Sequence, residues 1–488
     1  MPPMMVPAGV GPAVVETHVS TLFMVGEYVY KLKKSVRFDF VDLSSVAARE
    51  RICRREVELN RRLAPDVYLG VATVLGPDGA PCGSLVVMRR MPDQRRLATL
   101  VREGAEVADC LRDVARALAA FHASADRSDE IDAAGSLPAV RALWESNLST
   151  MAPFVGDVLD REMAARVALL ADRFLRGRAE LFAARVADGK VRDGHGDLLA
   201  DDIFCLEDGP RILDCLEFDD ALRYGDVLAD VAFLAMDLER IGAVELAQQF
   251  LGWYREYAGE TYPATLAHHY IAYRAHVRCK VACLRAAQGD ASAVGEARRL
   301  LELCDRHLQA GRVVLVIVGG LPGTGKSTLA AGIADRRSWT VLRSDEVRKD
   351  LAGIAHTARR NEEFGEGLYD QRSTEATYQA LLDRARILVE HGEPVVLDAS
   401  WSSARWRDAA RRLAAETASE LLELRCDAPS EIAARRLVQR LAAESDPSDA
   451  TAEVARRMAA VADPWATAVS IDTSSSRDRA LTVALEHV

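Results

Sequence analysis

A glycine-rich stretch that ends in lysine and serine carries the clearest chemistry in the sequence. Residues 313–329 read Val-Val-Leu-Val-Ile-Val-Gly-Gly-Leu-Pro-Gly-Thr-Gly-Lys-Ser-Thr-Leu, and they fit G-x-x-x-x-G-K-[ST] from Gly320 to Ser327. The backbone N–H groups of such a loop form a nest for phosphate groups, and the helix that follows directs its positive end at the same anion. The spacing therefore predicts a nucleotide phosphate site.

This pattern assigns roles within the loop. Lys326 is expected to reach the β- and γ-phosphates, and Ser327 is expected to bind Mg²⁺. Phosphate contacts are expected from Gly320, Gly323, Thr324, Gly325, Lys326, Ser327 and Thr328. A chance glycine-rich turn is the alternative, but strand, loop and helix follow in the order that the motif requires. We therefore expect ATP and Mg²⁺ as cofactors.

Two aspartates follow later apolar stretches of the same half. Asp345 comes after residues 339–343, and Asp398 ends the stretch 394–398. The carboxyl ends of parallel strands meet at one edge of a sheet, where Asp345 would deprotonate an acceptor hydroxyl and Asp398 would support Mg²⁺. Arg348 is the candidate contact to substrate or phosphate. A helix N-cap at Ser344-Asp345 is the alternative reading of this segment.

A lysine and a glutamate in the first half form a second candidate pair. Lys31 lies on the second strand of a hairpin predicted around Gly26-Glu27, and Glu56 lies on a helix predicted near residues 47–63. A strand lysine paired with a helix glutamate holds the α- and β-phosphates in protein-kinase-like folds. Two separate surface charges are the alternative.

Three aspartates extend this second candidate site. In His195-Gly196-Asp197-Leu198, Asp197 would accept the proton of a substrate hydroxyl, and Asp202 and Asp214 would bind Mg²⁺. The arrangement resembles aminoglycoside phosphotransferases and choline kinases, in which Asn is usual at the position of Asp202. The resemblance also implies that Asp226 steadies the catalytic loop. Further on, Arg274 and Arg278 share one helix face, which favours either a solvated surface or an anion site.

The second half is similar to P-loop small-molecule kinases such as chloramphenicol phosphotransferase, with wider similarity to gluconate kinases and zeta toxins. The loop at 320–327 and the S-D-x-x-R stretch at 344–348 carry the likeness. It implies that Arg436 and Arg440 belong to a lid that closes on the phosphates, with a solvated basic helix as the alternative. The polar segment 352–377 is expected to be a mobile substrate flap.

The elements that position these residues fall into two predicted domains. Residues 1–310 are expected to form a bilobal, protein-kinase-like α+β domain, with a small lobe of about residues 1–92 and a helical large lobe of about 93–310. Residues 311–488 are expected to form an α/β P-loop domain with a parallel sheet. Gly311 marks the boundary, because it ends an amphipathic helix. The order resembles a bacterial two-domain family that fuses an aminoglycoside phosphotransferase-like domain to a P-loop ATP-binding domain.

Composition narrows the class of partner and the compartment. The net charge of −11 argues against nucleic acid as a partner. The longest apolar run is far too short for a membrane helix, and no secretory signal is evident. Nine cysteines without C-x-x-C spacing favour reduced thiols over a disulfide framework or a zinc cluster. A cytoplasmic protein without a membrane partner is expected.

These observations favour an ATP- and Mg²⁺-dependent phosphotransferase, a kinase that acts on a small hydroxyl-bearing molecule. We expect the chemistry in the second half, whose loop matches its pattern without departures. One alternative is an aminoglycoside or amino-sugar kinase that uses Asp197 and Asp214, with a regulatory P-loop half. Another is a non-catalytic nucleotide sensor. The identity of the acceptor and the oligomeric state stay open.

Overall fold

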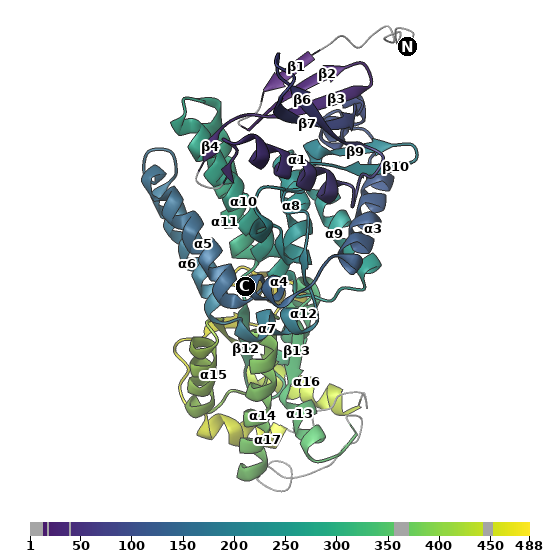
Figure 1. Ribbon diagram of the computed structural model, residues 1–488. Coiled ribbons are helices and arrows are strands. Elements are labelled where there is room, and N and C mark those ends of the chain that lie inside the picture. The colour runs from purple at the N-terminus through teal and green to yellow at the C-terminus, as the bar shows by residue number, and fades with distance from the viewer. Residues whose placement is uncertain (1–12, 17–18, 39–40, 356–369, 443–451) are drawn as a thin grey trace. The chain divides into compact units, whose positions relative to one another are not determined.

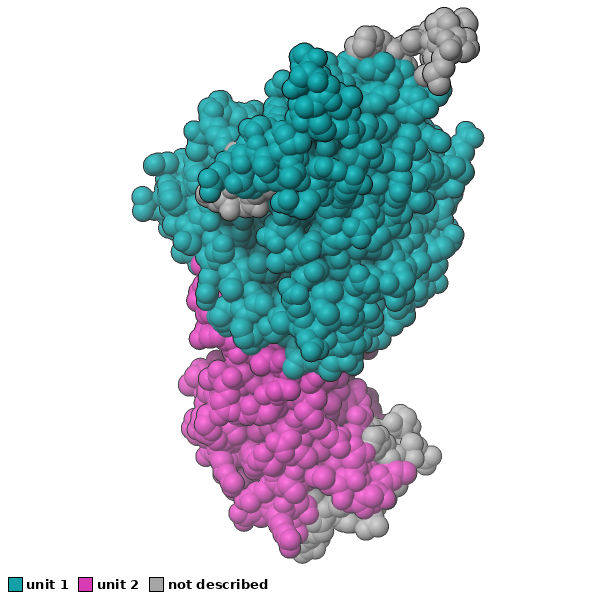
Figure 2. Space-filling view, viewed as in Figure 1, with its two compact units in different colours: residues 1–165, 182–262, 267–307 teal, residues 166–181, 263–266, 308–488 magenta. Residues whose placement is uncertain are grey.

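The computed structural model describes residues 13–16, 19–38, 41–355, 370–442 and 452–488 (Figure 1). The chain divides into two compact units, which Figure 2 shows in different colours. The first unit comprises residues 1–165, 182–262 and 267–307, and the second comprises 166–181, 263–266 and 308–488. The domain boundary predicted at Gly311 stays a prediction.

The small lobe of the first unit is an antiparallel sheet with one helix. The strand order is β1-β2-β3-β7-β6. The elements are β1 (Ala13–Glu16), β2 (Ser20–Val25), β3 (Tyr28–Lys33), α1 (Val46–Asn60), β6 (Tyr68–Leu75) and β7 (Pro81–Arg89), with a short β4 (Arg37–Phe38) and β5 (Val41–Asp42) before the helix. The predicted hairpin therefore forms, because Gly26 turns the chain with a φ of 58°.

The helix α1 packs on this sheet through a small apolar core. Cys53 and Val57 of α1 join Tyr68 and Val86 of the sheet in one buried cluster. Ser45 accepts a hydrogen bond from the backbone N–H of Ala48, which caps the start of α1. The packing fixes the rotation of α1 and so directs Glu56 toward the sheet.

The large lobe is mostly helical. Its principal helices are α2 (Leu97–Arg102), α3 (Ala108–Ser124), α4 (Asp129–Ala134), α5 (Leu137–Met151), α6 (Arg161–Arg176), α7 (Ala179–Ala187), α8 (Val227–Arg240), α9 (Val244–Ala258), α10 (Ala264–Ala287) and α11 (Ser292–Ala310). Residues 166–176 of α6 and 179–181 of α7 belong to the second unit. Two short antiparallel pairs flank the predicted catalytic loop: β8 (Val191–Asp193) pairs with β11 (Tyr224–Asp226), and β9 (Ile203–Leu206) pairs with β10 (Gly209–Ile212).

A five-stranded parallel sheet forms the centre of the second unit. Its order is β13-β14-β12-β15-β16. The strands are β12 (Val314–Gly319), β13 (Thr340–Arg343), β14 (Val395–Asp398), β15 (Glu420–Asp427) and β16 (Val469–Asp472). Every residue of β12 is buried, as expected for a central strand whose two faces are both covered.

Helices α12 (Lys326–Arg337), α13 (Ser344–Leu351), α14 (Gln371–Glu390), α15 (Ala404–Glu416), α16 (Ser430–Ala442), α17 (Ala452–Val461) and α18 (Arg477–Leu485) complete this unit. The flap predicted over residues 352–377 is partly wrong, because residues 371–377 form the first turns of α14. Asp370 caps that helix by accepting from the N–H of Ser373 at 2.6 Å. Residues 356–369 of the predicted flap lie outside the described part of the chain.

Candidate active sites

The lysine and glutamate predicted to pair in the first unit do so. Lys31 Nζ lies 2.8 Å from Oε1 of Glu56 and 2.8 Å from Oδ1 of Asp214. Burial alone would lower the pKa of Lys31, but the charges of Asp214 and Glu56 raise it well above its usual value. The amine of Lys31 therefore stays charged. Its two ion pairs connect the sheet to α1 and to the segment that follows β10.

A second lysine, which the sequence analysis missed, shares this cluster. Lys33 Nζ lies 2.7 Å from Oε2 of Glu56 and 2.6 Å from Oε1 of Glu217. Lys31 and Lys33 are two residues apart on β3, so both point to the same face of the sheet. That spacing was the signal available in the sequence. Each oxygen of Glu56 thus has its own cation, which holds the glutamate in one orientation.

The three predicted aspartates titrate differently. Burial raises the pKa of Asp197 to about 6, against the opposing charge of Arg278. Burial and the neighbouring charge of Asp214 raise the pKa of Asp202 well above its usual value. The charge of Lys31 lowers the pKa of Asp214 to about 2. The charges of Asp202 and Asp214 act on each other, and a raised pKa is what a general base near neutral pH needs. The roles predicted for the three aspartates stay predictions.

The catalytic loop is steadied by Asp230, and the assignment of this role to Asp226 is wrong. Oδ2 of Asp230 accepts from the backbone N–H of His195 at 2.7 Å, and Oδ1 accepts from that of Gly196 at 2.9 Å. Asp226 instead caps α8 and pairs with Arg185. Asp226 directly precedes α8 and Asp230 lies in its first turn. Their spacing in the sequence therefore did not show which of the two contacts the loop.

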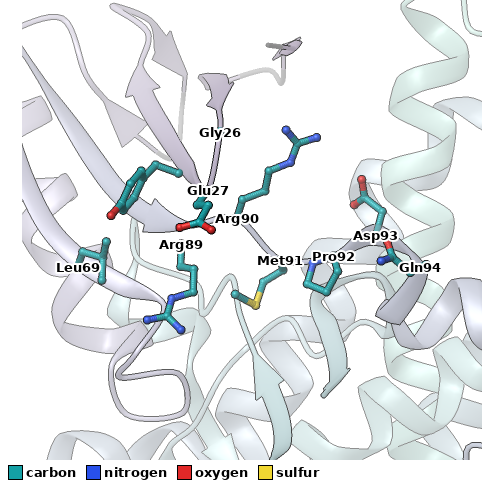
Figure 3. Close-up of a pocket in the computed structure, with 10 residues that line it drawn as sticks. Gly26, Glu27, Leu69, Arg89, Arg90, Met91, Pro92, Asp93 and Gln94 are labelled. Carbon is teal, nitrogen blue, oxygen red and sulfur yellow. The ribbon is translucent and has the colours of Figure 1, made fainter. Parts of the chain in front are cut away.

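A cavity of about 690 Å³ lies beside the segment that follows β7 (Figure 3). It is lined by Gly26, Glu27, Tyr28, Leu69, Arg89, Arg90, Met91, Pro92, Asp93 and Gln94. Tyr28 pairs with Arg89 across the strands, whereas Lys31 pairs with Val86. Because successive strand residues face opposite sides, the side chains of Tyr28 and Arg89 point away from Lys31.

The glycine-rich loop of the second unit needs its glycines. Gly320 and Gly323 have φ values of 141° and 84°. A Cβ on Gly320 would lie 2.7 Å from the carbonyl oxygen of Cys426, and one on Gly323 would lie 2.5 Å from that of Ala433. The loop therefore packs against β15 and α16 at distances that exclude a side chain. It leads directly into α12, which begins at Lys326.

The residues predicted to support Mg²⁺ in this unit meet. Ser327 hydrogen-bonds the carboxylate of Asp398, and Lys326 lies close enough for its charge to act on the same group. Burial nevertheless raises the pKa of Asp398. Within the described residues, Oδ1 of Asp398 is buried without a hydrogen-bond partner. An orphaned oxygen beside a serine hydroxyl fits the ligand set that Mg²⁺ uses, so Ser327 and Asp398 are the residues that would hold it.

Asp345 lies at the start of α13, near this group. Its charge acts on both Asp398 and Tyr378. The alternative, an N-cap at Ser344-Asp345, is wrong. The N-cap residue of α13 is Arg343, and its side chain makes no capping hydrogen bond. Arg348 is buried on the same helix and donates to Oγ1 of Thr374 at 3.4 Å. The roles predicted for Asp345 as a base and for Arg348 as a substrate or phosphate contact stay predictions.

Arg436 reaches the phosphate loop from α16. Its Nη2 donates to the carbonyl oxygen of Thr473 at 2.6 Å. A cavity of about 210 Å³ here is lined by Gly325, Thr328, Leu329, Arg436, Thr473, Ser475, Arg477, Ala480 and Leu481. Arg436 and Thr328 thus meet at one cavity, while the side chain of Arg440 lies outside the described residues. Thr324 donates its hydroxyl to the carbonyl of Leu321 at 2.8 Å, so only its backbone is left for phosphate.

Two family models match the chain, one in each half. The model described as a phosphotransferase enzyme family matches residues 36–268, and the model described as an AAA domain matches residues 315–465. The predicted fold class is confirmed: a kinase-like phosphotransferase domain precedes a P-loop domain with a parallel sheet.

Similarity over nearly the whole chain extends to two mycobacterial proteins. Uncharacterized protein Rv2004c of Mycobacterium tuberculosis is 43% identical over 466 residues, which cover 96% of this chain and 93% of the relative. Uncharacterized protein Mb2027c of Mycobacterium bovis has the same identity and coverage. The chain belongs to the family of these proteins. This family member combines two kinase-type domains and is a phosphotransferase of that class.

Solved structures resemble the two halves of this family member separately. A choline/ethanolamine kinase family protein from Mesorhizobium loti is 14% identical, covers 62% of this chain and 93% of its own, and has a TM-score of 0.39. A gluconokinase from Sinorhizobium meliloti 1021 is 18% identical, covers 36% and 90%, and has a TM-score of 0.26. These likenesses carry no functional argument.

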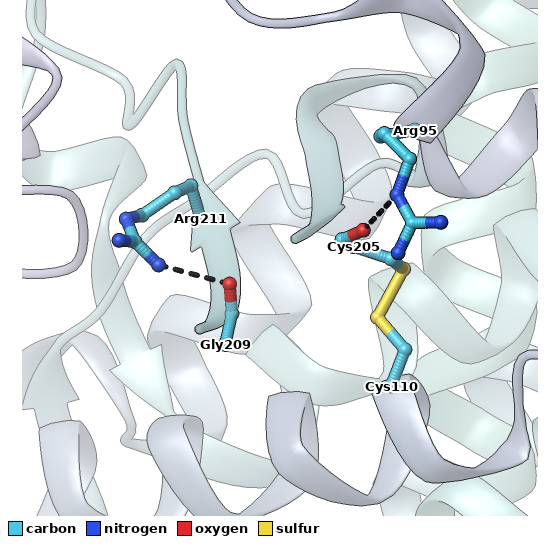
Figure 4. Close-up of a disulfide and its surroundings, with 5 residues drawn as sticks. All are labelled: Arg95, Cys110, Cys205, Gly209 and Arg211. Atoms are coloured by element: carbon cyan, nitrogen blue, oxygen red, sulfur yellow. Dashed lines mark hydrogen bonds between the residues drawn. A yellow bond between two sulfur atoms is a disulfide. The ribbon is translucent and has the colours of Figure 1, made fainter. Parts of the chain in front are cut away.

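The expectation of reduced thiols is wrong for two of the nine cysteines of this family member. Cys110 of α3 and Cys205 of β9 form a disulfide across 95 residues of sequence (Figure 4). The carbonyl oxygen of Cys205 also accepts from Nε of Arg95 at 2.6 Å. The pairing depends on the packing of α3 against the small sheet, which cysteine spacing does not show. The remaining seven cysteines are free.

The described part of this family member contains neither a membrane-spanning helix nor a preformed metal cluster. None of its helices there has both the length and the apolar character needed to cross a membrane. Nor do three or more His, Cys, Asp or Glu side chains converge there as a preformed metal cluster.

Proposed function

We propose that this protein is an ATP- and Mg²⁺-dependent kinase that transfers the γ-phosphate to a hydroxyl group of a small molecule. The proposed site of chemistry is the P-loop unit. The observation that carries the proposal is the carboxylate of Asp398, hydrogen-bonded by Ser327 yet with one buried oxygen left without a partner among the described residues. A buried carboxylate oxygen of this kind supports a site for the cation that accompanies a bound triphosphate.

Each side chain of the proposed site has a separate role in the transfer. Lys326 and the loop N–H groups offset the charge on the transferring phosphoryl group, where most catalysis of this reaction lies. Asp345 accepts the proton of the acceptor hydroxyl, and Arg348 orients the acceptor or the phosphate. A bound Mg²⁺ would neutralise phosphate charge at Ser327 and Asp398. Arg436 would close on the nucleotide at the cavity beside Gly325.

The test is acceptor-stimulated ADP release with Mg-ATP, measured on a panel of sugars, amino sugars, aminoglycosides and nucleosides. Lys326→Ala is expected to lower the stimulated rate by roughly 10²- to 10³-fold, because a fixed positive charge at the transferring group is lost. Arg337→Ala, at the exposed opposite end of α12, is the control and is expected to keep the rate.

The outcomes separate the candidate functions. Loss of stimulated release in Lys326→Ala and retention in Asp197→Asn support chemistry in the P-loop unit. The reverse pattern would place the chemistry in the first unit. Tight ATP binding without stimulated ADP release, whatever acceptor is offered, would favour a nucleotide sensor and contradict the proposal.

A further inference from the structure

Two arginines of α10 lie beside the carboxylate that the first unit would use as a base. Arg274 and Arg278 are four residues apart and so project from one face of the helix. Arg274 fixes α10 against the catalytic loop: its Nε donates to the carbonyl oxygen of Ala229 at 3.0 Å, and its Nη1 approaches that of Gly196 at 3.5 Å. The same guanidinium group lies 4.7 Å above the ring of Phe233.

Arg278 makes no comparable hydrogen bond to the backbone in the described part of the chain. Its Nε is buried there without a hydrogen-bond partner. Its charge still reaches Asp197, where it opposes the burial that raises the pKa of that carboxyl. A buried donor without a partner costs free energy, so Arg278 is placed for a partner that the described protein groups do not supply.

Three other acidic groups, Asp202, Asp214 and Asp237, lie close enough to Asp197 for their charges to act on it or to feel its charge. Asp237 accepts from Arg240 at 2.7 Å, and Asp214 is paired with Lys31 at 2.8 Å. Two guanidinium groups, those of Arg278 and Arg274, act on the carboxylate of Asp197.

We propose that Arg274 and Arg278 form an anion-binding subsite, so that the acceptor of the first unit carries a carboxylate or a phosphate group beside its reacting hydroxyl. A triphosphate and an anionic acceptor repel each other, and two guanidinium groups offset that repulsion in a poorly solvated site. The planar fork of arginine suits the oxygens of both anions. This activity is separate from the chemistry proposed for the P-loop unit.

In the transfer, Asp197 takes the proton of the acceptor hydroxyl, and the oxygen of that hydroxyl bonds to the γ-phosphorus of ATP. The bond from this phosphorus to the β,γ-bridging oxygen breaks, and ADP leaves with the electron pair. Arg278 holds the anionic group of the acceptor before and during the transfer. It therefore acts on acceptor affinity more than on the chemical step.

The experiment uses the full-length Lys326→Ala protein, so that the P-loop unit is silenced and its own proposed function is not under test. ADP release is measured with four matched six-carbon acceptors: glucose, glucosamine, gluconate and glucose 6-phosphate. The last two are expected to stimulate release, and the preferred one distinguishes a carboxylate from a phosphate. Adding Arg278→Met is expected to raise the KM for that acceptor roughly 10- to 100-fold with a smaller change in kcat.

Arg285→Met is the matched control. Arg285 lies on the same helix but pairs with Asp290 and Glu296, so its loss is expected to leave the KM unchanged. Arg278→Lys is expected to recover part of the affinity because it restores the charge. Preference for glucose or glucosamine, or an unchanged KM in Arg278→Met, would overturn the proposal.

A binding measurement covers the case in which none of the four compounds stimulates release. Gluconate or glucose 6-phosphate is then expected to raise the melting temperature of the Lys326→Ala protein, and Arg278→Met is expected to remove that increase. No increase with either anion, or an equal increase in Arg278→Met, would contradict an anion site at these arginines.

Discussion

At the scale of single residues, the buried carboxyl of Asp197 lowers the stability of the folded first unit when it is ionised. Its pKa is raised to about 6 by burial, with Arg278 acting in the opposite direction. The folded state therefore binds its proton more tightly than the unfolded chain, whose aspartates titrate near pH 4. Stability is lost as pH rises from about 4 to 6, and the full penalty for the ionised carboxylate applies above that window.

Asp197→Asn is therefore expected to raise the free energy of unfolding of the first unit by about 1–3 kcal/mol at pH 7. The gain should disappear below about pH 4, where the wild-type carboxyl is protonated in both states. Thermal unfolding of both proteins across this range, without nucleotide or divalent cation, measures it. Asp109→Asn, at an exposed position of α3, is the control. Equal stability of Asp197→Asn and wild type at pH 7 would contradict the raised pKa.

The sequence was sufficient to predict those site residues that belong to a recognisable motif or to a residue pair typical of the fold. It identified Lys31 with Glu56, and Ser327 with Asp398, and the structure brings each pair together. It missed Asp230, because Asp226 and Asp230 differ only in which one points at the loop. That difference is set by the start of α8 and not by residue type.

At the scale of elements, the disulfide between Cys110 and Cys205 joins α3 to β9. The strand β9 begins at Ile203, directly after Asp202. The crosslink removes conformational entropy from the unfolded chain and ties the end of the catalytic loop to a long helix. Its two cysteines are far apart in sequence, so it was not predictable from spacing.

Cys110→Ser is expected to lower the free energy of unfolding of the first unit by about 2–4 kcal/mol. Dithiothreitol should destabilise the wild type by a similar amount and leave Cys110→Ser unchanged. Denaturant unfolding with and without the reductant measures both effects. Cys82→Ser, which replaces an exposed free thiol, serves as the control. A wild type that is insensitive to the reductant would argue against the crosslink.

On the scale of the whole molecule, the second unit is assembled from separate stretches of the chain. Residues 166–181 belong to it together with 308–488. Within it, a Cβ on Gly177 would lie 1.9 Å from the carbonyl oxygen of Thr417. The buried Arg178 donates to the same oxygen at 2.8 Å. A fragment that begins near Gly311 would lack these contacts, which no local pattern in the sequence reveals.

Each unit is proposed to bind its own nucleotide. The most direct measurement is the number of non-hydrolysable ATP analogues bound per chain by titration calorimetry, with Mg²⁺ present. Wild type is expected to bind two, and Lys326→Ala and Lys31→Met are each expected to bind one, at the opposite unit. Two sites that persist in Lys326→Ala, or a single wild-type site that survives in Lys326→Ala and disappears in Lys31→Met, would contradict nucleotide use by the P-loop unit.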